Sequence, residues 1–360
     1  MSDNHPMLAE AAERFFSAKV DQEAILAFEQ SGLDHTLWTA ARALGLSRPG
    51  ESVDAGEGWQ ASEIVLRAGG RHAAPMPLAE EVVAAQLASA AGISLPPGSV
   101  GVGLACRPAE DPGLWACEAP FGRDLDHLLV VGGGGDGLEL RLHACTGAPH
   151  GSGENVAGEP RDVLLVDPQS AIENKVLDLP EDVLTTLLAA ARTSQMAGAL
   201  ETILALSVAY AREREQFGRK IGKFQAVQQQ LAVLAGQVAA AGVAAADAAR
   251  ALDQRGLPAA KFGSPEDPSF EIAVAKVVVG EAAEFGPRIA HQVLGAIGFT
   301  HEHRLQFFTR RLWAWRAECG SAAFWAERLG RFGLATENGG LWKILTDRSG
   351  PAQETKGPRD

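Results

Sequence analysis

The sequence predicts a mainly α-helical protein with a small β-domain in the middle of the chain. Apolar residues recur at helical spacing near both ends, whereas residues 99–171 alternate short apolar runs with dense glycine and proline. With 360 residues, 46% of them apolar, the chain can bury a sizeable core. We therefore expect a helical domain at residues 1–98, a reduced β-domain at 99–171, a helical bundle at 172–345 and a flexible tail at 346–360.

The N-terminal region shows three helical segments. Apolar spacing indicates helices at Leu8–Phe16 and Glu23–Gln30, and the alanine-rich run Glu80–Ala91 is a strong helix former. The prolines of the segment Ala74–Pro77 break the pattern before the third helix.

The middle region contains apolar runs of strand length. They are Val100–Ala105, Leu128–Val131, Leu138–Leu142 and Val163–Val166. The glycine run Gly132–Gly137 lies between two of them and is followed by a strand pattern rather than a helix. A phosphate-binding loop needs a helix N-terminus directly after it, so we expect a hairpin turn here.

The C-terminal region contains long helical patterns. One apolar stripe repeats at intervals of three and four residues and consists of Phe224, Val227, Leu231, Leu234 and Val238. The alanine-rich segment that follows permits close approach of neighbouring helices. Several long helices of this kind predict an antiparallel bundle.

Composition excludes several classes of function. The 45 acidic and 32 basic residues give a formal charge of −13, which argues against a nucleic-acid-binding protein. No long apolar run or signal peptide is evident, so we expect no membrane span and a cytoplasmic location. Cys106, Cys117, Cys145 and Cys319 lack metal-ligand spacing and are expected to be reduced thiols. The run His301–His303 does not place its histidines on one helix face, so we expect no metal site.

Two segments of the C-terminal region carry a family resemblance. Residues 210–231 read YAREREQFGRKIGKFQAVQQQL, and residues 291–311 read HQVLGAIGFTHEHRLQFFTRR. They resemble the two C-terminal signatures of the acyl-CoA dehydrogenases, which are Arg-x-x-Phe-Gly followed by Ile and Phe-Gln, and Gln-x-x-Gly-Gly-x-Gly-Tyr/Phe-Thr. The resemblance implies a β-barrel-like middle domain and a C-terminal four-helix bundle.

The resemblance also implies bound FAD. The arginine matching Arg214 meets the flavin pyrophosphate, for which a planar, permanently charged guanidinium is well suited. Phe217 matches a residue that packs against the cofactor, and Ala296 replaces the second glycine of the later signature. The expected cofactor-binding residues are Arg214, Gln216, Phe217, Gln292, Gly295 and Ala296.

The base that such a dehydrogenase needs is displaced in this sequence. Family members remove the α-proton of an acyl thioester with a glutamate, usually in a Tyr-Glu-Gly-Thr stretch after the second signature. An ungapped match places Cys319 at that position and Glu318 one residue earlier, about 100° away around a helix. Glu318 is therefore the candidate catalytic base. The flavin contacts of the family's β-domain are not recognisable at residues 99–171.

These observations leave three hypotheses. The first is an FAD-dependent acyl-CoA dehydrogenase, as one subunit of a heteromer with a second acyl-CoA dehydrogenase-like chain. The second is a homo-oligomer that uses Glu318 as a displaced base, and the third is a non-catalytic scaffold subunit that binds no flavin. For the enzyme, the resemblance implies an acyl-CoA substrate, electron-transferring flavoprotein as the acceptor, and an oligomeric state.

Overall fold

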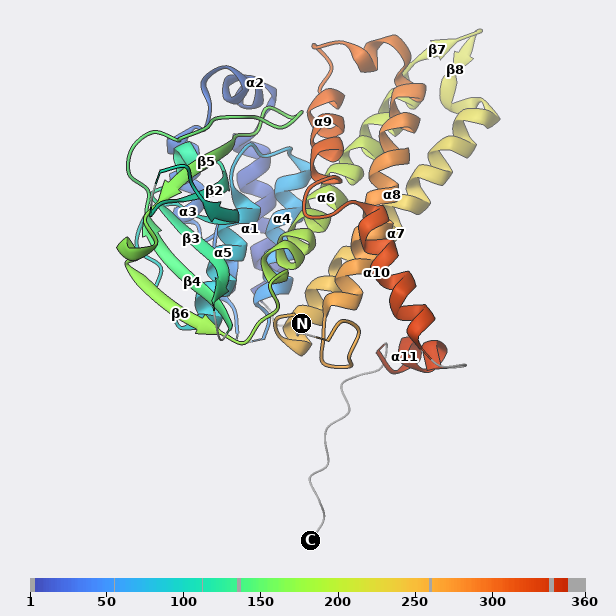
Figure 1. The fold of residues 1–360 in the computed structure, drawn as a ribbon. Coiled ribbons are helices and arrows are strands. Elements are labelled where there is room, and N and C mark those ends of the chain that lie inside the picture. Colours follow the sequence, from blue (N-terminus) through green and yellow to red (C-terminus); the bar gives the residue numbers. More distant parts are fainter. Residues whose placement is uncertain are drawn as a thin grey trace.

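The computed structural model describes residues 4–54, 56–111, 113–134, 137–258, 261–336 and 340–348. Helices come first along the chain, a six-stranded sheet follows, and a second group of long helices completes the molecule (Figure 1). The sheet lies beside the N-terminal helices, and the long helices stand on the other side of the molecule. The mainly α-helical fold with a small central sheet is thus confirmed.

The N-terminal helices coincide with the predicted segments. They are α1 (Asn4–Lys19), α2 (Gln22–Ser31), α3 (His35–Ala43), α4 (Gly58–Arg71) and α5 (Leu78–Ala91). The side chain of Asp21 accepts a hydrogen bond from the backbone N–H of Ala24, which caps α2. Asp34 caps α3 in the same way, through the N–H groups of Thr36 and Leu37. Helix α4 is capped by a residue distant in sequence: Asp253 on α7 accepts hydrogen bonds from the backbone N–H groups of Trp59 and Gln60.

The sheet has the strand order β5–β2–β1–β3–β4–β6. Its strands are β1 (Val100–Pro108), β2 (Trp115–Pro120), β3 (His127–Gly134), β4 (Gly137–Ala144), β5 (Arg161–Val166) and β6 (Glu173–Leu177). Only the β1–β3 pairing is parallel within this order. The four predicted strands are confirmed, whereas β2 and β6 were not predicted, and β6 lies beyond the expected boundary at residue 171.

The glycine run between β3 and β4 joins two antiparallel strands. Gly134 pairs with Gly137, as expected for a hairpin, while residues 135 and 136 lie outside the described residues. On the neighbouring pair of strands, Cys106 and Cys117 form a disulfide. The expectation of four reduced thiols is therefore wrong for this pair, because β1 and β2 lie side by side in a register that residue spacing does not reveal. Cys145 and Cys319 are free.

The bundle is built on three long helices, which are α6 (Val183–Glu213), α7 (Gln225–Arg255) and α8 (Ser269–Leu294). The shorter helices of this region are α9 (Leu305–Trp315), α10 (Ala322–Ala335) and α11 (Gly340–Arg348). Of the predicted apolar stripe, Leu234 and Val238 are buried, and the three residues before them are half-buried. Helix α11 continues past residue 346, where the flexible tail was expected to begin, and residues 349–360 lie outside the described residues.

Helix α7 is long and apolar enough to cross a membrane, judged by length and composition alone. It packs against α6 and α8 in the bundle, and a third of its most apolar stretch is buried there. A core helix passes the same test, so this finding is weak evidence for a membrane span.

Candidate functional site

Glu318 lies in the turn between α9 and α10 rather than within a helix. Cys319 and Gly320 follow it with φ angles of 56° and 88°, which reverse the chain before α10 begins. The ammonium group of the buried Lys276 on α8 donates to the carbonyl oxygens of Trp315 and Glu318, at 3.0 and 2.6 Å. These bonds hold the turn, so the position of Glu318 follows from tertiary contacts rather than from helix rotation.

Two arginines bind the carboxylate of Glu318. Arg161 on β5 donates to Oε1 through Nε and Nη2, at 3.1 and 2.5 Å, and Arg192 on α6 donates to Oε2 at 2.9 Å. Asn155 is a third residue that donates to this carboxylate, at 3.1 Å. Burial alone would raise the pKa of Glu318, but Arg192 and Arg161 outweigh burial and lower it to about 2. A carboxylate with so low a pKa is a weak base.

The thiol of Cys319, which occupies the family's base position, offers no replacement. Burial raises its pKa to about 11, despite the nearby charges of Arg192 and Lys276. The thiol therefore stays protonated in the neutral pH range. Neither side chain has the raised basicity that removal of an α-proton requires.

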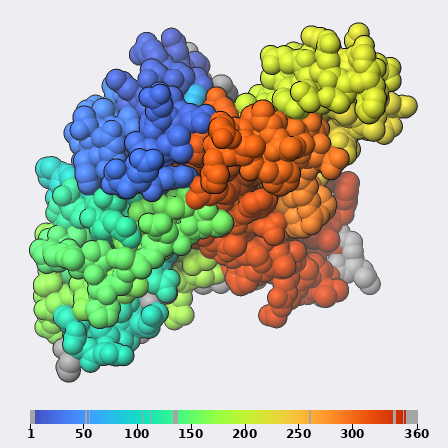
Figure 2. Space-filling view, turned by 90° about the horizontal axis from the view of Figure 1, so that it is seen from above, coloured from blue at the N-terminus to red at the C-terminus, as the bar shows by residue number. Residues whose placement is uncertain are grey.

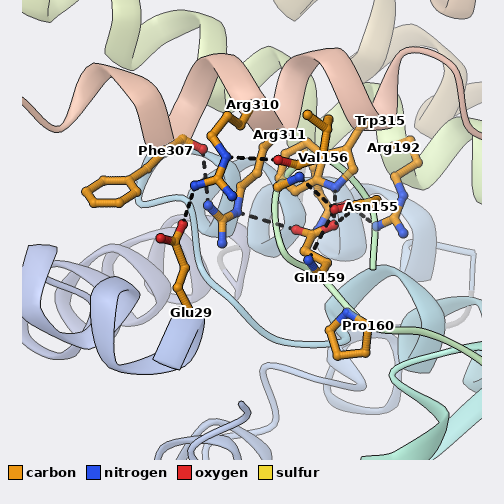
Figure 3. Close-up of polar contacts among 12 residues, drawn as sticks. Glu29, Asn155, Val156, Glu159, Pro160, Arg192, Phe307, Arg310, Arg311 and Trp315 are labelled. Carbon is orange, nitrogen blue, oxygen red and sulfur yellow. Dashed lines mark hydrogen bonds and ion pairs between the residues drawn. The ribbon is translucent and has the colours of Figure 1, made fainter. Parts of the chain in front are cut away.

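The arginines around Glu318 belong to a larger network of buried ions. Arg192 also donates to Glu80 on α5, at 2.5 Å. Glu159 accepts from Arg161 at 3.1 Å and from the indole N–H of Trp315 at 2.9 Å, and it pairs with the buried Arg311 on α9 (Figure 3). We call the following six residues the Glu–Arg network: Glu80, Glu159, Glu318, Arg161, Arg192 and Arg311.

A cavity of about 460 Å³ lies beside this network, between the sheet and the helices. Leu104, Pro120 and Leu188 contribute apolar surface to its wall. Its charged lining consists of four carboxylates and two guanidinium groups: Glu80, Glu118, Asp162, Glu318, Arg161 and Arg192. This excess of negative charge does not suit the pyrophosphate of a flavin dinucleotide.

The first group of expected cofactor-binding residues lies far from this cavity, on an exposed hairpin. Strands β7 (Glu215–Gln216) and β8 (Arg219–Lys220) are joined by Phe217 and Gly218, whose φ angles are 52° and 76°. Both angles are positive, as in the tight type I′ hairpin turn. Phe217 is 92% exposed, and Arg214 and Gln216 are exposed beside it.

The second group lies where α8 ends. Gln292 is exposed in its last turn, and Gly295 terminates the helix with a φ angle of 63°. Gly295 and Ala296 are exposed, and a Cβ added to Gly295 would meet no atom within 4 Å. Strands β7 and β8 lie at the same end of the bundle as the C-terminal end of α8 (Figure 1). Seen from above, the yellow-green segment around β7 and β8 projects beyond the orange end of α8 (Figure 2).

This exposed surface fits a flavin that approaches from outside the chain. The side chain of Arg214 makes no ion pair within the part of the chain that the structure describes, so its donors are available to an anion. The open backbone at Gly295 permits close approach. The internal cavity, in contrast, does not fit FAD. No group of three or more potential metal ligands occurs among the described residues.

Comparisons with known proteins agree with this fold and these motifs. Residues 182–332 match the family model described as acyl-CoA dehydrogenase, C-terminal domain. The acyl-CoA dehydrogenase FadE34 of Mycobacterium tuberculosis is 38% identical over 149 residues, or 41% of this chain and 19% of the relative. The acyl-CoA dehydrogenase IpdE2 of the same organism is 34% identical over 36% of this chain and 35% of its own length. These alignments thus cover well under half of either relative.

Similar solved structures extend over nearly the whole chain. A variant of the Tcur3481–Tcur3483 steroid acyl-CoA dehydrogenase has a TM-score of 0.77 at 23% identity, covering 93% of this chain and 99% of that chain. Butyryl-CoA dehydrogenase from Megasphaera elsdenii has a TM-score of 0.75 at 17% identity, with the same coverage. Nearly the whole chain therefore has the fold of these dehydrogenases. Its C-terminal region, residues 182–332, belongs to the acyl-CoA dehydrogenase family.

The partners of Glu318 were missed in the sequence. Arg192 gave one usable signal, because it is a lone cation in the long apolar stretch of α6 and therefore needs a buried counter-ion. Its partners Glu80 and Glu318 stand 112 and 126 residues away. No local pattern connects these positions.

Proposed function

We propose that this chain is one subunit of an FAD-dependent acyl-CoA dehydrogenase and completes a flavin site on a second chain of the same family. The single observation that supports the proposal is the separation of two groups of residues. The expected cofactor-binding residues face solvent at one end of the bundle, while the candidate base Glu318 is held by Arg161 and Arg192 beside a cavity that does not suit a flavin. A chain built in this way can contribute to a neighbour's site better than it can use its own.

Each exposed residue has a role in this proposal. Arg214 would donate charge-assisted hydrogen bonds to the pyrophosphate of a flavin bound to the partner. Phe217, held outward by the turn, packs against the cofactor, and Gln292 approaches it beside the open backbone of Gly295. When bound, FAD would accept the β-hydrogen of the acyl-CoA as hydride, and a base on the partner chain would take the α-proton, which together give the α,β-unsaturated thioester. Electron-transferring flavoprotein would accept the electrons.

Two similar structures support a partner from the same family. One is described as the ChsE4–ChsE5 complex from Mycobacterium tuberculosis, and another as the Tcur3481–Tcur3483 steroid acyl-CoA dehydrogenase. Both descriptions name two proteins. We propose a heteromer of the same kind here, acting on an acyl-CoA in the cytoplasm.

Co-purification tests the proposal. The chain is expressed with each acyl-CoA dehydrogenase-like chain encoded beside it, and the flavin content of every complex is measured from its visible absorbance. We expect one partner to bring bound flavin and dehydrogenase activity together. A stable complex whose flavin content is unaffected by Arg214→Ala would instead support a scaffold subunit.

A further inference from the structure

The Glu–Arg network joins parts of the chain that are distant in sequence. Arg192 belongs to α6, Glu80 to α5, Glu318 to the turn after α9, and Arg161 to β5. A single run of ion pairs therefore connects an N-terminal helix, the bundle and the sheet. Such a run resists separation of the sheet from the bundle.

The network is balanced in charge, and most of it is buried. Glu80 is completely buried and Arg192 is 3% exposed, whereas Glu318 and Arg161 are half-buried. Its three carboxylates and three guanidinium groups carry no net charge, and each carboxylate contacts at least one arginine. Removing one member of a buried pair leaves an uncompensated ion, which is far more costly than loss of a surface pair.

The turn that carries Glu318 is fixed from the opposite side. Lys276 is fully buried and donates to carbonyl oxygens of Trp315, Arg316 and Glu318. Arg161 and Arg192 hold the carboxylate of the same residue. Backbone and side chain of Glu318 are thus both fixed, so the carboxylate is poorly placed to swing toward a ligand.

The cavity beside the Glu–Arg network repels the phosphates of a dinucleotide, because its lining is negatively charged. Arg161 and Arg192 are the two cations in its lining, and both already bind Glu318. Oε2 of Glu80 is buried without a hydrogen-bond partner. An anion that entered the cavity would meet its carboxylates, and it would find both guanidinium groups already paired with Glu318.

We propose that the Glu–Arg network holds the sheet against the bundle, as a ligand bound between them would do in another protein. We call this holding of the sheet against the bundle the clamp, and it is a property of the single chain. The cavity beside the network binds no flavin.

Thermal unfolding of the full chain on its own tests the clamp. We expect Glu318→Gln to reduce the folding equilibrium constant about 100-fold or more, and so to lower the melting temperature by several degrees. The matched control is Glu327→Gln, which removes the same charge from an exposed pair with Arg331 and should change the melting temperature little. Equal effects of the two variants would overturn the clamp.

A milder pair of variants keeps the test decisive if Glu318→Gln does not fold. Asn155→Ala removes the hydrogen bond that a neutral amide donates to Glu318, together with the bonds of Asn155 to Glu159 and to the loop backbone. Arg161→Gln removes one of the two guanidinium charges that bind Glu318. We expect both variants to melt below the wild type, Arg161→Gln by more. Wild-type melting temperatures for both would overturn the clamp.

Titration of the isolated chain with FAD tests whether the cavity binds flavin. We expect no rise in melting temperature, and no binding that depends on residues of the cavity. Leu188→Trp, which narrows the cavity, should leave the flavin content of the complex unchanged. One tightly bound FAD per isolated chain, lost in Leu188→Trp, would overturn the inference. The proposed function fails separately, if Arg214→Ala leaves the flavin content of the complex intact.

Discussion

Nε of Arg192 lies 2.9 Å from Oε2 of Glu318, although the two residues are 126 positions apart. This contact joins the turn after α9 to α6, the first helix of the bundle. The positive charges of Arg192 and Arg161 hold the carboxylate of Glu318 in place, and they also lower its pKa, so that it is a weak base.

The lowered pKa of Glu318 predicts a specific loss of stability in acid. Its folded-state pKa is about 2, below the ordinary value of 4.5, so its contribution is complete above pH 4.5 and is lost as the pH falls toward 2. The shift corresponds to about 3 kcal/mol of unfolding free energy. Thermal unfolding between pH 7 and pH 3 should show a smaller decline for Glu318→Gln than for the wild type. Parallel declines would contradict the assignment.

A second stability prediction concerns the crossing of α4 and α6. A Cβ added to Gly198 on α6 would lie 1.9 Å from the carbonyl oxygen of Arg67 on α4. Gly198→Ala must therefore push the two helices apart, at a cost of about 1–3 kcal/mol or more in urea unfolding. Gly236→Ala on α7 is the control, because its Cβ would meet no atom within 4 Å, and helix propensity should stabilise it by up to ~1 kcal/mol.

Much of the fold follows from local patterns in the sequence. Residues at helical spacing, such as Leu234 and Val238, turn the same side of a helix toward the core wherever that core lies. The strand β2 escaped prediction because Cys117 and Ala119 are buried in a run that also holds charge and proline. Its pairing with β1 is a tertiary property, and so is the disulfide.

The candidate site also has one part that could be predicted from the sequence and one part that depends on the fold. Arg214 and Phe217 belong to one contiguous motif, so their neighbourhood could be predicted from sequence alone, and the structure adds that it is exposed. Glu318 acquires its partners Arg161 and Arg192 only when sheet and bundle meet. A pKa set by such contacts has no signature in the residues flanking it.

Arg214 should matter for retention of flavin and not for folding. Arg214→Ala would remove a charge-assisted contact to the pyrophosphate, worth about 1.5–3 kcal/mol, or roughly 10- to 150-fold in affinity. The side chain is exposed, so the melting temperature of the isolated chain should not change. Arg331→Ala, in an exposed pair with Glu327, is the control for general loss of charge. Unchanged affinity of the complex for FAD would rule out this role.

An active complex would allow Glu318 to be tested as the base that removes the α-proton of the acyl-CoA. Loss of a general base commonly lowers the rate about 100- to 10,000-fold. Because Arg161 and Arg192 hold Glu318 ionised and fixed, we expect Glu318→Gln to keep turnover within several-fold of the wild type, per folded complex. Single-turnover flavin reduction with saturating acyl-CoA measures this step directly. A loss of 100-fold or more with normal flavin content would restore Glu318 as the base.

The last prediction concerns the chain without its partner. Phe217 is 92% exposed, Phe299 71% and Val243 on α7 71%, so a lone monomer presents apolar surface together with the residues proposed to contact the partner's flavin. We therefore expect the isolated chain to be an oligomer with little dehydrogenase activity and less than one FAD per chain. The correct partner should raise flavin content and activity in the same proportion, because one interface supplies both. Size-exclusion chromatography with flavin quantitation and an artificial electron acceptor measures all three quantities on one sample. A fully flavinylated and fully active homo-oligomer would exclude the heteromer, while the match of the C-terminal region to the acyl-CoA dehydrogenases would stand.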